Sequence, residues 1–342
     1  MPGATAVISL ERSPPCGRER STYSFQAAQT AHRPFSFVEA YHDVAPFASL
    51  VDAEGEHPLS FFETVVGMAY AAFADAPVDA AIVEVGMGGS WDATNVVQAK
   101  VAVITPISVD HAKYLGERPE DIAIEKAGII KPGSVAVLAE QTPEVAAVLL
   151  ERAAEVGATV AREGMEFGVV SRTPAVGGQV VSLQGLRGRY DDVFLPLYGA
   201  HQAQNAAVAL AAVEAFGTGE LDDDLVRAAF AEVTSPGRLE IIRRSPTIVL
   251  DAAHNPHGAE AVAAALDDSF SFSPLIGVMG VMEDKDAEGV LAFISAYKGP
   301  ALFQLCDFHA FMGSAEIRRR LRDLFQSCPG ATIHGPLPTG CW

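Results

Sequence analysis

The sequence predicts an α/β protein whose larger domain is a parallel sheet covered by helices on both faces. Three observations predict this class. Short, continuously apolar runs alternate with helical patterns over residues 61–156, as in parallel strands joined by crossover helices. Short β-like pieces between glycine-rich turns in residues 159–197 indicate a small antiparallel patch. A second strand–helix alternation begins at Thr247, which predicts a smaller second domain.

The strands of the larger domain follow from apolar runs and from the residues that end them. Residues 61–73 (FFETVVGMAYAAF) have helical apolar spacing and precede the first run. Gly86 closes the first run and Pro106 the second, so each run has the length of a buried strand. The predicted strands are Ala80–Val85, Val101–Thr105 and Val135–Ala139.

Helix start and stop signals define the segments between and after these strands. Pro119 suits the first turn of a helix that runs to about Ala127. Glu144–Val156 is amphipathic, and Gly157 provides a C-terminal stop. Further helices are predicted at His201–Phe216 and Leu225–Val233, after Pro256 and after Asp286, with strands at Thr247–Leu250 and Leu275–Met279. The hinge signal Ser235-Pro236-Gly237 places a domain boundary near Thr234.

Composition and charge exclude several classes of protein. The 342 residues have room for about two domains. A formal net charge of −19 argues against nucleic acid as a partner and against an anionic membrane surface. The chain has no apolar run of about 18 residues and no secretory signal, so we expect a cytoplasmic protein. The four cysteines lack CxxC spacing, which argues against a zinc site or a disulfide framework; they are Cys16, Cys306, Cys328 and Cys341.

Two polar clusters follow the first two predicted strands of the sheet. Glu84 begins a glycine-rich segment that runs to Asn95, and His111 follows the strand that ends at Thr105. Ligands of α/β proteins bind at this carboxyl edge, and a carboxylate, an imidazole and substrate phosphates make a plausible magnesium or manganese site. The structural alternatives are a tight turn with a salt-bridged glutamate and a structural histidine.

Five further clusters carry polar residues at the ends of predicted elements. Each has an ordinary structural explanation as well, such as helix capping, complementation of a helix dipole or a solvated charge run. These clusters are Glu125–Lys131, Leu197–Asn205, Ser235–Glu240, Leu250–His257 and Asp284–Asp286. No single cluster distinguishes a structural role from a functional one. The order of all the clusters along the chain does.

In this order the clusters resemble the folylpolyglutamate synthase/dihydrofolate synthase family of the Mur ligase superfamily. The resemblance covers roughly residues 36–295, about three quarters of the chain. It implies a parallel-sheet ATPase domain with a small antiparallel patch and a smaller, truncated Rossmann-like C-terminal domain. The matching strings are FFETVVGMAYAAF, EVGMGGSWDATNVV, VAVITPISVDHAKYLG, IAIEKAGIIKPG, LPLYGAHQAQNAAVAL, SPGRLE, LDAAHNPHGA and MEDKD.

The resemblance implies an ATP-dependent amide ligase that adds L-glutamate to folate, with dihydropteroate as a further candidate substrate. The carboxylate is phosphorylated by ATP, and the amine of glutamate attacks the acyl phosphate. The implied cofactors are ATP and Mg²⁺, with room for a second divalent or monovalent cation. We expect a monomer whose partners are these small molecules.

The same resemblance assigns roles to individual residues. Glu84 and His111 match the magnesium ligands, and Lys126 matches a carbamylated lysine that supplies a negative group for a second metal. His254 matches a histidine near the nucleotide and the glutamate site, so Lys126 and His254 are the catalytic candidates. Asn205, Arg238 and Asp251 match contacts to ATP. Asp92, with Ala93 beside it, matches a contact to the pterin ring.

The chain departs from the family pattern in three places. Ser90 stands where the family usually has arginine, and the family's phosphate loop, TNGKGS, has no counterpart, since the sequence contains no Gly-Lys pair. From residue 298 onward the pattern is lost. We therefore expect four segments: a non-matching and disordered start at 1–34, an ATPase domain without its phosphate loop at 35–234, a partial glutamate-ligase domain at 235–297 and a non-matching tail at 298–342.

Three alternatives to an active folate ligase remain open from the sequence. A catalytically impaired remnant or binding protein is consistent with the missing phosphate loop. A muramyl-peptide ligase would belong to the same superfamily, but DATN and HQAQN favour folate. A Rossmann dehydrogenase would need a GxGxxG segment that opens a helix, and the sequence has none.

Overall fold

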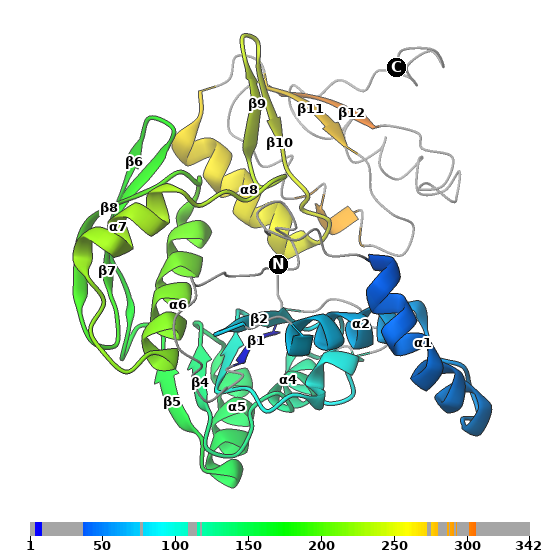
Figure 1. Ribbon diagram of the computed structural model, residues 1–342. Helices are drawn as coiled ribbons and strands as arrows, with labels where there is room; N and C mark the ends of the chain where they lie inside the picture. Colours follow the sequence, from blue (N-terminus) through cyan, green and yellow to red (C-terminus); the bar gives the residue numbers. More distant parts are fainter. Residues whose placement is uncertain are drawn as a thin grey trace. The chain divides into compact units, whose positions relative to one another are not determined.

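A computed structural model describes residues 4–8, 37–75, 78–108, 115–116, 118–271, 275–279, 286, 288–290, 292 and 301–305 (Figure 1). The chain divides into two compact units. The N-terminal unit takes its residues from Pro2–Phe167 and Val208–Glu220, and the C-terminal unit from Gly168–Ala207 and Leu221–Trp342. This division falls at Gly168 and Leu221, whereas the sequence analysis placed a boundary near Thr234.

A five-stranded sheet in the order β2-β1-β3-β4-β5 forms the centre of the N-terminal unit. Strands β3, β4 and β5 are parallel, with Val135 paired to Val101 on one side and to Thr159 on the other. The three predicted strands are present as β2, β3 and β4. The bounds are β1 (Ala4–Ile8), β2 (Ala81–Glu84), β3 (Val101–Ile104), β4 (Val135–Leu138) and β5 (Thr159–Arg162).

Strand β1 runs against the direction of its two neighbours. Its register pairs Thr5 with Glu84 of β2 and with Val103 of β3, both antiparallel. The expectation of disorder throughout residues 1–34 is therefore wrong for Ala4–Ile8. The physical reason is that β2 and β3 both face this position, and their backbone donors and acceptors need a partner there. An apolar, β-branched segment (ATAVI) meets that need.

The helices of the N-terminal unit begin and end where the sequence signals predict. Pro119 opens α4, and Gly128 follows its last residue. Thr142 caps α5 through the amide of Val145, and Gly157 ends it in the left-handed conformation. The bounds are α1 (Phe37–Glu54), α2 (Phe61–Asp75), the 3₁₀ helix η1 (Ala93–Val96), α4 (Pro119–Ala127) and α5 (Pro143–Val156).

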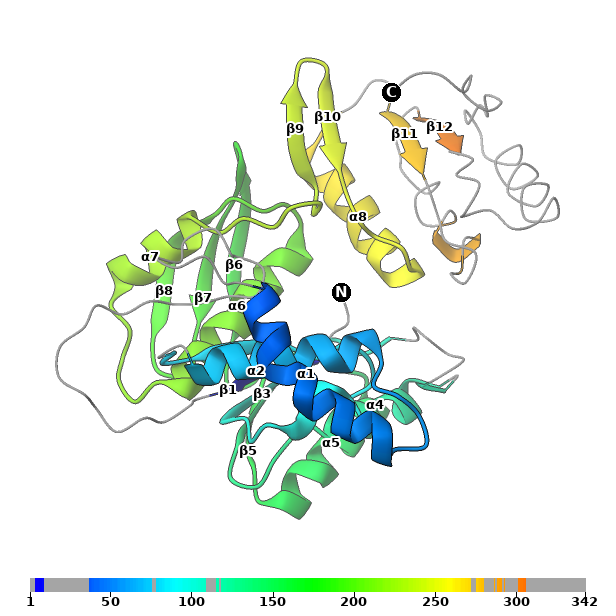
Figure 2. The ribbon, with the colours of Figure 1, turned by 45° about the vertical axis from the view of Figure 1, so that its right-hand side comes forward.

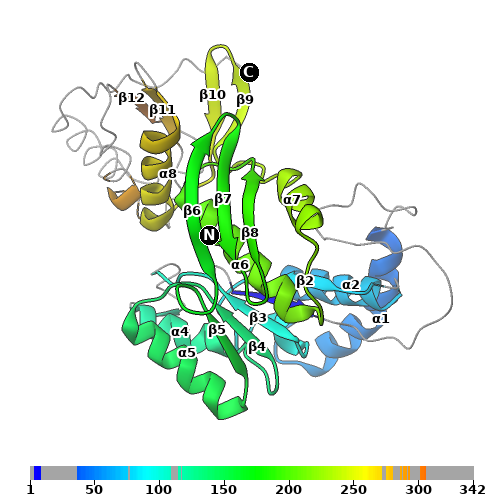
Figure 3. The ribbon, with the colours of Figure 1, turned by 90° about the vertical axis from the view of Figure 1, so that its left-hand side faces the viewer.

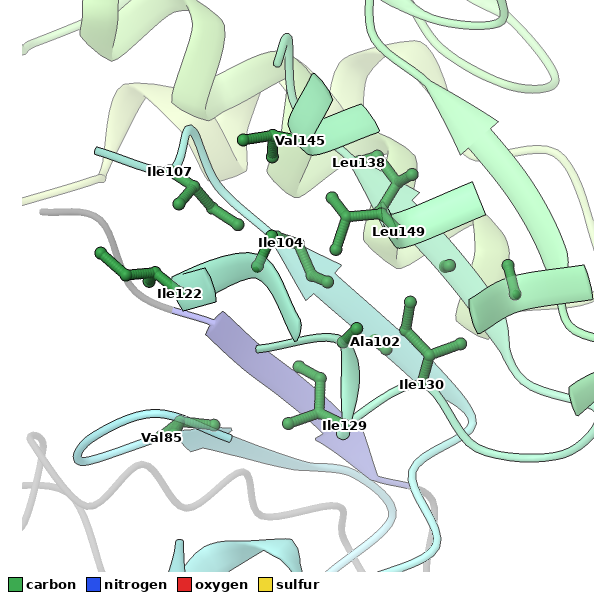
Figure 4. Packing of buried hydrophobic residues seen from close by; sticks show 14 of the residues in the cluster. Val85, Ala102, Ile104, Ile107, Ile122, Ile129, Ile130, Leu138, Val145 and Leu149 are labelled. Carbon is green, nitrogen blue, oxygen red and sulfur yellow. The ribbon is translucent and has the colours of Figure 1, made fainter. Parts of the chain in front are cut away.

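Helices α4 and α5 pack against one face of the sheet (Figure 4). The core between them contains Ile104 of β3, Ile122 of α4 and Leu149 of α5, all fully or almost fully buried. Ile129 and Ile130, which follow α4, close the same cluster. This packing determines where the carboxyl ends of β2 and β3 lie relative to the last turn of α4.

Helix α2 packs on a second, smaller cluster beside β2. Ala81 and Val83 point into this cluster together with Ala99, and the rings of Tyr70 and Phe73 lie against them. The alternate residues of β2, Ile82 and Glu84, are exposed. Because side chains alternate along a strand, the burial of Ala81 and Val83 places the Glu84 carboxylate on the accessible face of β2.

The C-terminal unit begins with the predicted antiparallel patch, the sheet β6-β7-β8. Helix α7 lies beside β8 (Figure 3). Helix α8 and the β9-β10 hairpin share the buried cluster of Leu239, Ala265 and Leu266 (Figure 2). The bounds are β6 (Gly168–Ala175), β7 (Gly178–Gln184), β8 (Arg189–Leu195), α6 (Ala200–Phe216), α7 (Asp223–Ala231), β9 (Glu240–Arg244), β10 (Thr247–Leu250), α8 (Pro256–Ser269), β11 (Leu275–Met279) and β12 (Ala301–Leu305).

The last four strands do not form one parallel sheet, although the sequence predicted a second alternation of strands and helices in this region. Strand β10 pairs antiparallel with β9, and β11 pairs parallel with β12 in a separate sheet. Helix α6 contributes its first residues to the C-terminal unit and its remainder to the N-terminal unit. None of the helices in the described ranges is both long enough and apolar enough to cross a membrane.

We predict that Leu149→Ala lowers the free energy of unfolding by about 2–5 kcal/mol, because it opens a cavity in a fully buried cluster. Urea unfolding followed by circular dichroism measures this change. Ile124→Ala, on the exposed side of α4, serves as the matched control and should shift the value by less than about 1 kcal/mol. Equal losses in the two variants would contradict the assigned core.

Candidate functional site

The glycine-rich segment after β2 lies directly on the last turn of α4. Ser90 donates from its backbone nitrogen to the carbonyl oxygen of Glu125 at 2.9 Å, and its hydroxyl donates to the same oxygen at 3.1 Å. A side chain on Gly89 would overlap that carbonyl and lie 2.9 Å from the Cα of Lys126. The structure therefore joins the clusters around Glu84 and Lys126, which are far apart in the sequence.

Asn95 and Lys131 tie the far end of this segment to the residues after α4. The amide nitrogen of Asn95 donates to the carbonyl oxygens of Ser90 at 3.1 Å and Gly128 at 3.3 Å. The ammonium group of Lys131 donates to the carbonyl oxygen of Asn95 at 3.3 Å. Burial lowers the pKa of Lys131, and the nearby charge of Arg152 acts in the same direction.

Asp92 organises the segment from within. One carboxylate oxygen accepts from the amide of Met87 at 2.8 Å, and the other accepts from the amide and hydroxyl of Thr94. Asp92 is buried and caps η1, which begins at Ala93. Tyr70 donates to the Thr94 carbonyl at 2.7 Å, and burial together with the Asp92 charge raises the pKa of Tyr70 to about 12. In the structure the Asp92 carboxylate binds its own loop, and Ala93 lies half-buried beside it.

The predicted metal residues take different positions. Glu84 ends β2 with an exposed side chain, whereas Lys126 is buried in the last turn of α4. His111 lies outside the described residues. Ser108 Oγ and Glu125 Oε2 are buried atoms without a hydrogen-bond partner in the part of the chain that the structure describes. Within the same ranges, no three His, Cys, Asp or Glu side chains form a cluster that could hold a metal ion.

A glutamine that the sequence analysis missed holds the segment after β3. Gln141 donates from its side-chain nitrogen to the carbonyl oxygen of Thr105 at 2.9 Å. Its side-chain oxygen accepts from the amide of Ile107 at 3.0 Å. The side-chain amide of Gln141 thus both donates and accepts, and it holds the backbone that leads to Ser108. The sequence offered no signal for this role of Gln141, because its partners Thr105 and Ile107 are more than 30 residues away in the chain.

In the C-terminal unit, Asp251 holds the turn that carries Arg238. Its carboxylate accepts from the amides of Leu239 at 2.9 Å and Ala253 at 2.7 Å. Leu239 has a φ of 47°, a left-handed conformation that is strained for leucine. These bonds bring the SPGRLE and LDAAHNP segments together.

Arg238 lines a cavity of about 360 Å³ in this unit. Its Nη2 atom is buried and has no hydrogen-bond partner among the residues that the structure describes. Tyr198, Glu240 and Arg244 also line the cavity. An unpaired, buried guanidinium nitrogen is costly, so Arg238 would gain from an anionic or strongly hydrogen-bonding partner.

Three further predicted residues lie in the C-terminal unit. His254 places Nδ1 3.0 Å from the carbonyl oxygen of Ala252, just before the Asn255 cap of α8. Asn205, exposed on α6, donates to Gln202 at 3.3 Å. Burial lowers the pKa of His201 from its usual 6.5 to about 4, and the positive charge of Arg238 acts in the same direction.

Comparison with known proteins decides the family. A model of the Mur ligase middle domain matches residues 57–213, and one of the Mur ligase glutamate ligase domain matches residues 237–326. A crystal structure of Mycobacterium tuberculosis folylpolyglutamate synthase complexed with ADP and AMPPCP superposes with a TM-score of 0.82 and 44% identity, covering 97% of this chain and 76% of that one. The chain belongs to the folylpolyglutamate synthase family of Mur ligases.

Two relatives agree with this family in sequence. The dihydrofolate synthase/folylpolyglutamate synthase of M. tuberculosis is 54% identical over 276 residues, which cover 76% of this chain and 57% of the relative. The enzyme of the same name from Escherichia coli is 36% identical over 252 residues, which cover 74% of this chain and 57% of the relative. The chain thus spans 57% of the length of each relative. Both are folate ligases, so the muramyl-peptide alternative gains no support.

The predicted resemblance and the Mur-ligase-like α/β fold are confirmed. The glutamate ligase match extends to residue 326, which is beyond the expected end of family-like sequence at residue 297. The four expected segment boundaries otherwise stay a prediction.

We predict that Gly89→Ala lowers the free energy of unfolding by about 1–3 kcal/mol, because the added methyl group meets the Glu125 backbone, which cannot rotate away. Thermal and urea unfolding measure the loss. Gly219→Ala is the matched control, since a methyl group there would meet nothing within 4 Å. A destabilisation no larger than that of the control would disprove the tight contact.

We predict that His201 makes the chain less stable in acid. Its folded pKa is about 4, so the unfolded chain binds a proton between about pH 6.5 and 4 that the folded chain does not, and stability falls as pH falls through this window. Urea unfolding at pH 8 and pH 5 compares the wild type with His201→Gln. The wild type should lose about 1–2 kcal/mol more than the variant. Identical losses would show that His201 does not titrate this way.

Proposed function

We propose that this chain is an ATP-dependent ligase that joins L-glutamate to the carboxylate of folate or dihydropteroate. The observation that carries the proposal is that the Asp251 carboxylate holds the turn that places Arg238 at the wall of a cavity, in a chain 54% identical to a dihydrofolate synthase/folylpolyglutamate synthase. Solved structures of relatives include an E. coli enzyme in complex with DHPP and ADP and a folylpolyglutamate synthase with AMPPCP and folate.

The C-terminal unit supplies the proposed nucleotide contacts. The guanidinium group of Arg238 would contact an oxygen of ATP, and the Asp251 carboxylate holds the backbone that carries Arg238. Asn205, on the exposed side of α6, would add an amide donor and acceptor. A charge-assisted hydrogen bond in a cavity wall is stronger than a neutral one, so Arg238 should dominate the affinity.

The N-terminal unit supplies the proposed metal and folate contacts. Mg²⁺ usually keeps several waters and takes one or two protein carboxylates together with substrate phosphates, and the exposed Glu84 at a strand end fits that requirement. His111 would be its second ligand, and Lys126, carbamylated, would serve a second cation. When bound, the metal would neutralise the charge that develops on the phosphates. Asp92 would act on the pterin through the loop that it holds.

The proposed ligation has two steps. A carboxylate oxygen of the folate substrate bonds to the γ-phosphorus of ATP, and the bond to ADP breaks. The glutamate amine then bonds to the acyl carbon, phosphate leaves, and the amine loses a proton. Because Nδ1 of His254 donates to the Ala252 carbonyl, the lone pair of the neutral ring lies on Nε2, which would accept that proton.

The direction of β1 favours a second candidate function, folate binding without ligation. In the family, a strand leads into the phosphate loop at the carboxyl edge of the sheet. Here Ile8 pairs with Ala81, so β1 ends at the amino edge of β2, away from Glu84. The last residue of β1 therefore lies at the edge opposite to the one at which the family's phosphate loop follows its strand.

We predict that Arg238→Gln weakens ATP binding about 10- to 100-fold, because a charge-assisted hydrogen bond is worth about 1.5–3 kcal/mol. Isothermal titration with ATP and Mg²⁺ measures the nucleotide affinity, and a separate titration measures binding of dihydropteroate or tetrahydrofolate. Incorporation of labelled glutamate into the same two compounds measures ligation. Arg243→Gln, exposed on β9, is the matched control and should leave both unchanged.

Three results are distinguishable in these assays. Ligation that falls in Arg238→Gln but not in Arg243→Gln supports the proposed ligase. Binding of dihydropteroate by the wild type without ligation supports the second candidate instead. Binding of neither nucleotide nor folate would reject both functions for this chain.

A further inference from the structure

Helices α1 and α2 expose an unusual amount of apolar side chain. Phe47 is 69% exposed and Phe61 is 83% exposed. We call the exposed set the α1–α2 surface: Phe37, Val38, Tyr41, Phe47, Leu50, Val51, Phe61 and Phe62. Five of the eight are aromatic, and aromatic side chains contribute most to the energetics of protein interfaces.

The packing of α1 explains this exposure. Ala40 is the only buried residue within α1, and Val44 lies against Gly67 of α2. The remaining large apolar residues of the helix do not face the sheet core, which α4 and α5 cover from their own side. A helix that is apolar around much of its circumference is ordinarily covered, so the composition of α1 indicates a missing neighbour.

The charge of the residues in and around α1 and α2 limits which kind of partner can bind there. Residues 37–75 contain seven carboxylates and no lysine or arginine: Glu39, Asp43, Asp52, Glu54, Glu56, Glu63 and Asp75. An acidic surface repels anionic lipid headgroups, which disfavours a membrane. It also disfavours a second copy of the chain, because two such hairpins would bring like charges together.

We propose that the α1–α2 surface binds a basic amphipathic helix of another protein. The apolar face of such a helix would cover the exposed aromatic and aliphatic residues, and its lysines and arginines would pair with the carboxylates around them. A helix suits the site because the surface is itself built from two packed helices, against which a third packs by the same ridges and grooves. This inference is independent of the proposed ligase activity.

The test uses the full chain and a designed probe. The probe is a fluorescent 18-residue peptide of leucine and lysine with leucines at helical spacing, and a second peptide carries glutamate in place of lysine. Fluorescence anisotropy should give a micromolar Kd for the lysine peptide that weakens as salt is added. The glutamate peptide should bind at least about tenfold more weakly.

A matched pair of variants separates this surface from general attraction to an acidic protein. Leu50→Ser should weaken binding of the lysine peptide about tenfold or more, because it removes an apolar side chain that the bound helix would bury. Leu225→Ser is the control, since Leu225 is similarly exposed (63%, against 60% for Leu50) and follows Asp222, Asp223 and Asp224 on α7. It should leave the Kd unchanged. If Leu50→Ser proves unfolded by circular dichroism, Phe47→Ser replaces it.

Several outcomes would overturn the proposal. Equal effects of Leu50→Ser and Leu225→Ser would mean that the peptide binds by charge alone. If the lysine peptide fails to bind at a chain concentration of roughly 100 μM, the α1–α2 surface does not bind basic amphipathic helices. The same result is expected if another part of the chain already covers the surface. Analytical ultracentrifugation should show the same mass for wild type and Leu50→Ser. A dimer that depends on Leu50 would assign the surface to a second copy instead.

Discussion

Hydrogen bonding from Ser90 to the Glu125 carbonyl holds the glycine-rich segment after β2 against the last turn of α4, and the N-terminal half of the site depends on this contact. It requires Gly89 to have no side chain, because the two backbones touch there. Ser90 also packs closely against Gly128. Local backbone contact, rather than charge, positions this loop.

The sheet is subject to a second constraint, which is the need to pair every backbone group between β2 and β3. Both strands face β1, so the position is filled whatever the direction of the strand that fills it. An antiparallel strand satisfies the same donors and acceptors as a parallel one. It reverses, however, the edge at which the following residues emerge, so stability of the sheet and the ability to cradle phosphates are separate properties of this fold.

In the C-terminal unit, a single carboxylate connects two segments that the sequence shows only as separate motifs. Asp251 accepts from Leu239 and Ala253, and this pairing offsets the strain of the left-handed Leu239. The turn then directs Arg238 into the wall of a cavity with one buried donor unpaired. Strain and an unsatisfied donor in the same turn are typical of a ligand site rather than of a structural turn.

Much of this fold was predictable from sequence because its signals are local. Apolar runs ended by Gly86 and Pro106 predicted β2 and β3, and Pro119 and Gly157 marked the start of α4 and the end of α5. Motif order alone was sufficient to identify the family. Tertiary structure decided the rest. The sequence carried no signal that β1 would lie between β2 and β3, since strand order depends on which unpaired edges remain. It likewise could not show that Asp92 binds its own loop, that Gln141 holds the segment after β3, or that large apolar side chains of α1 are exposed. These features depend on distances between residues that are remote in the chain, and only the packed structure determines those distances.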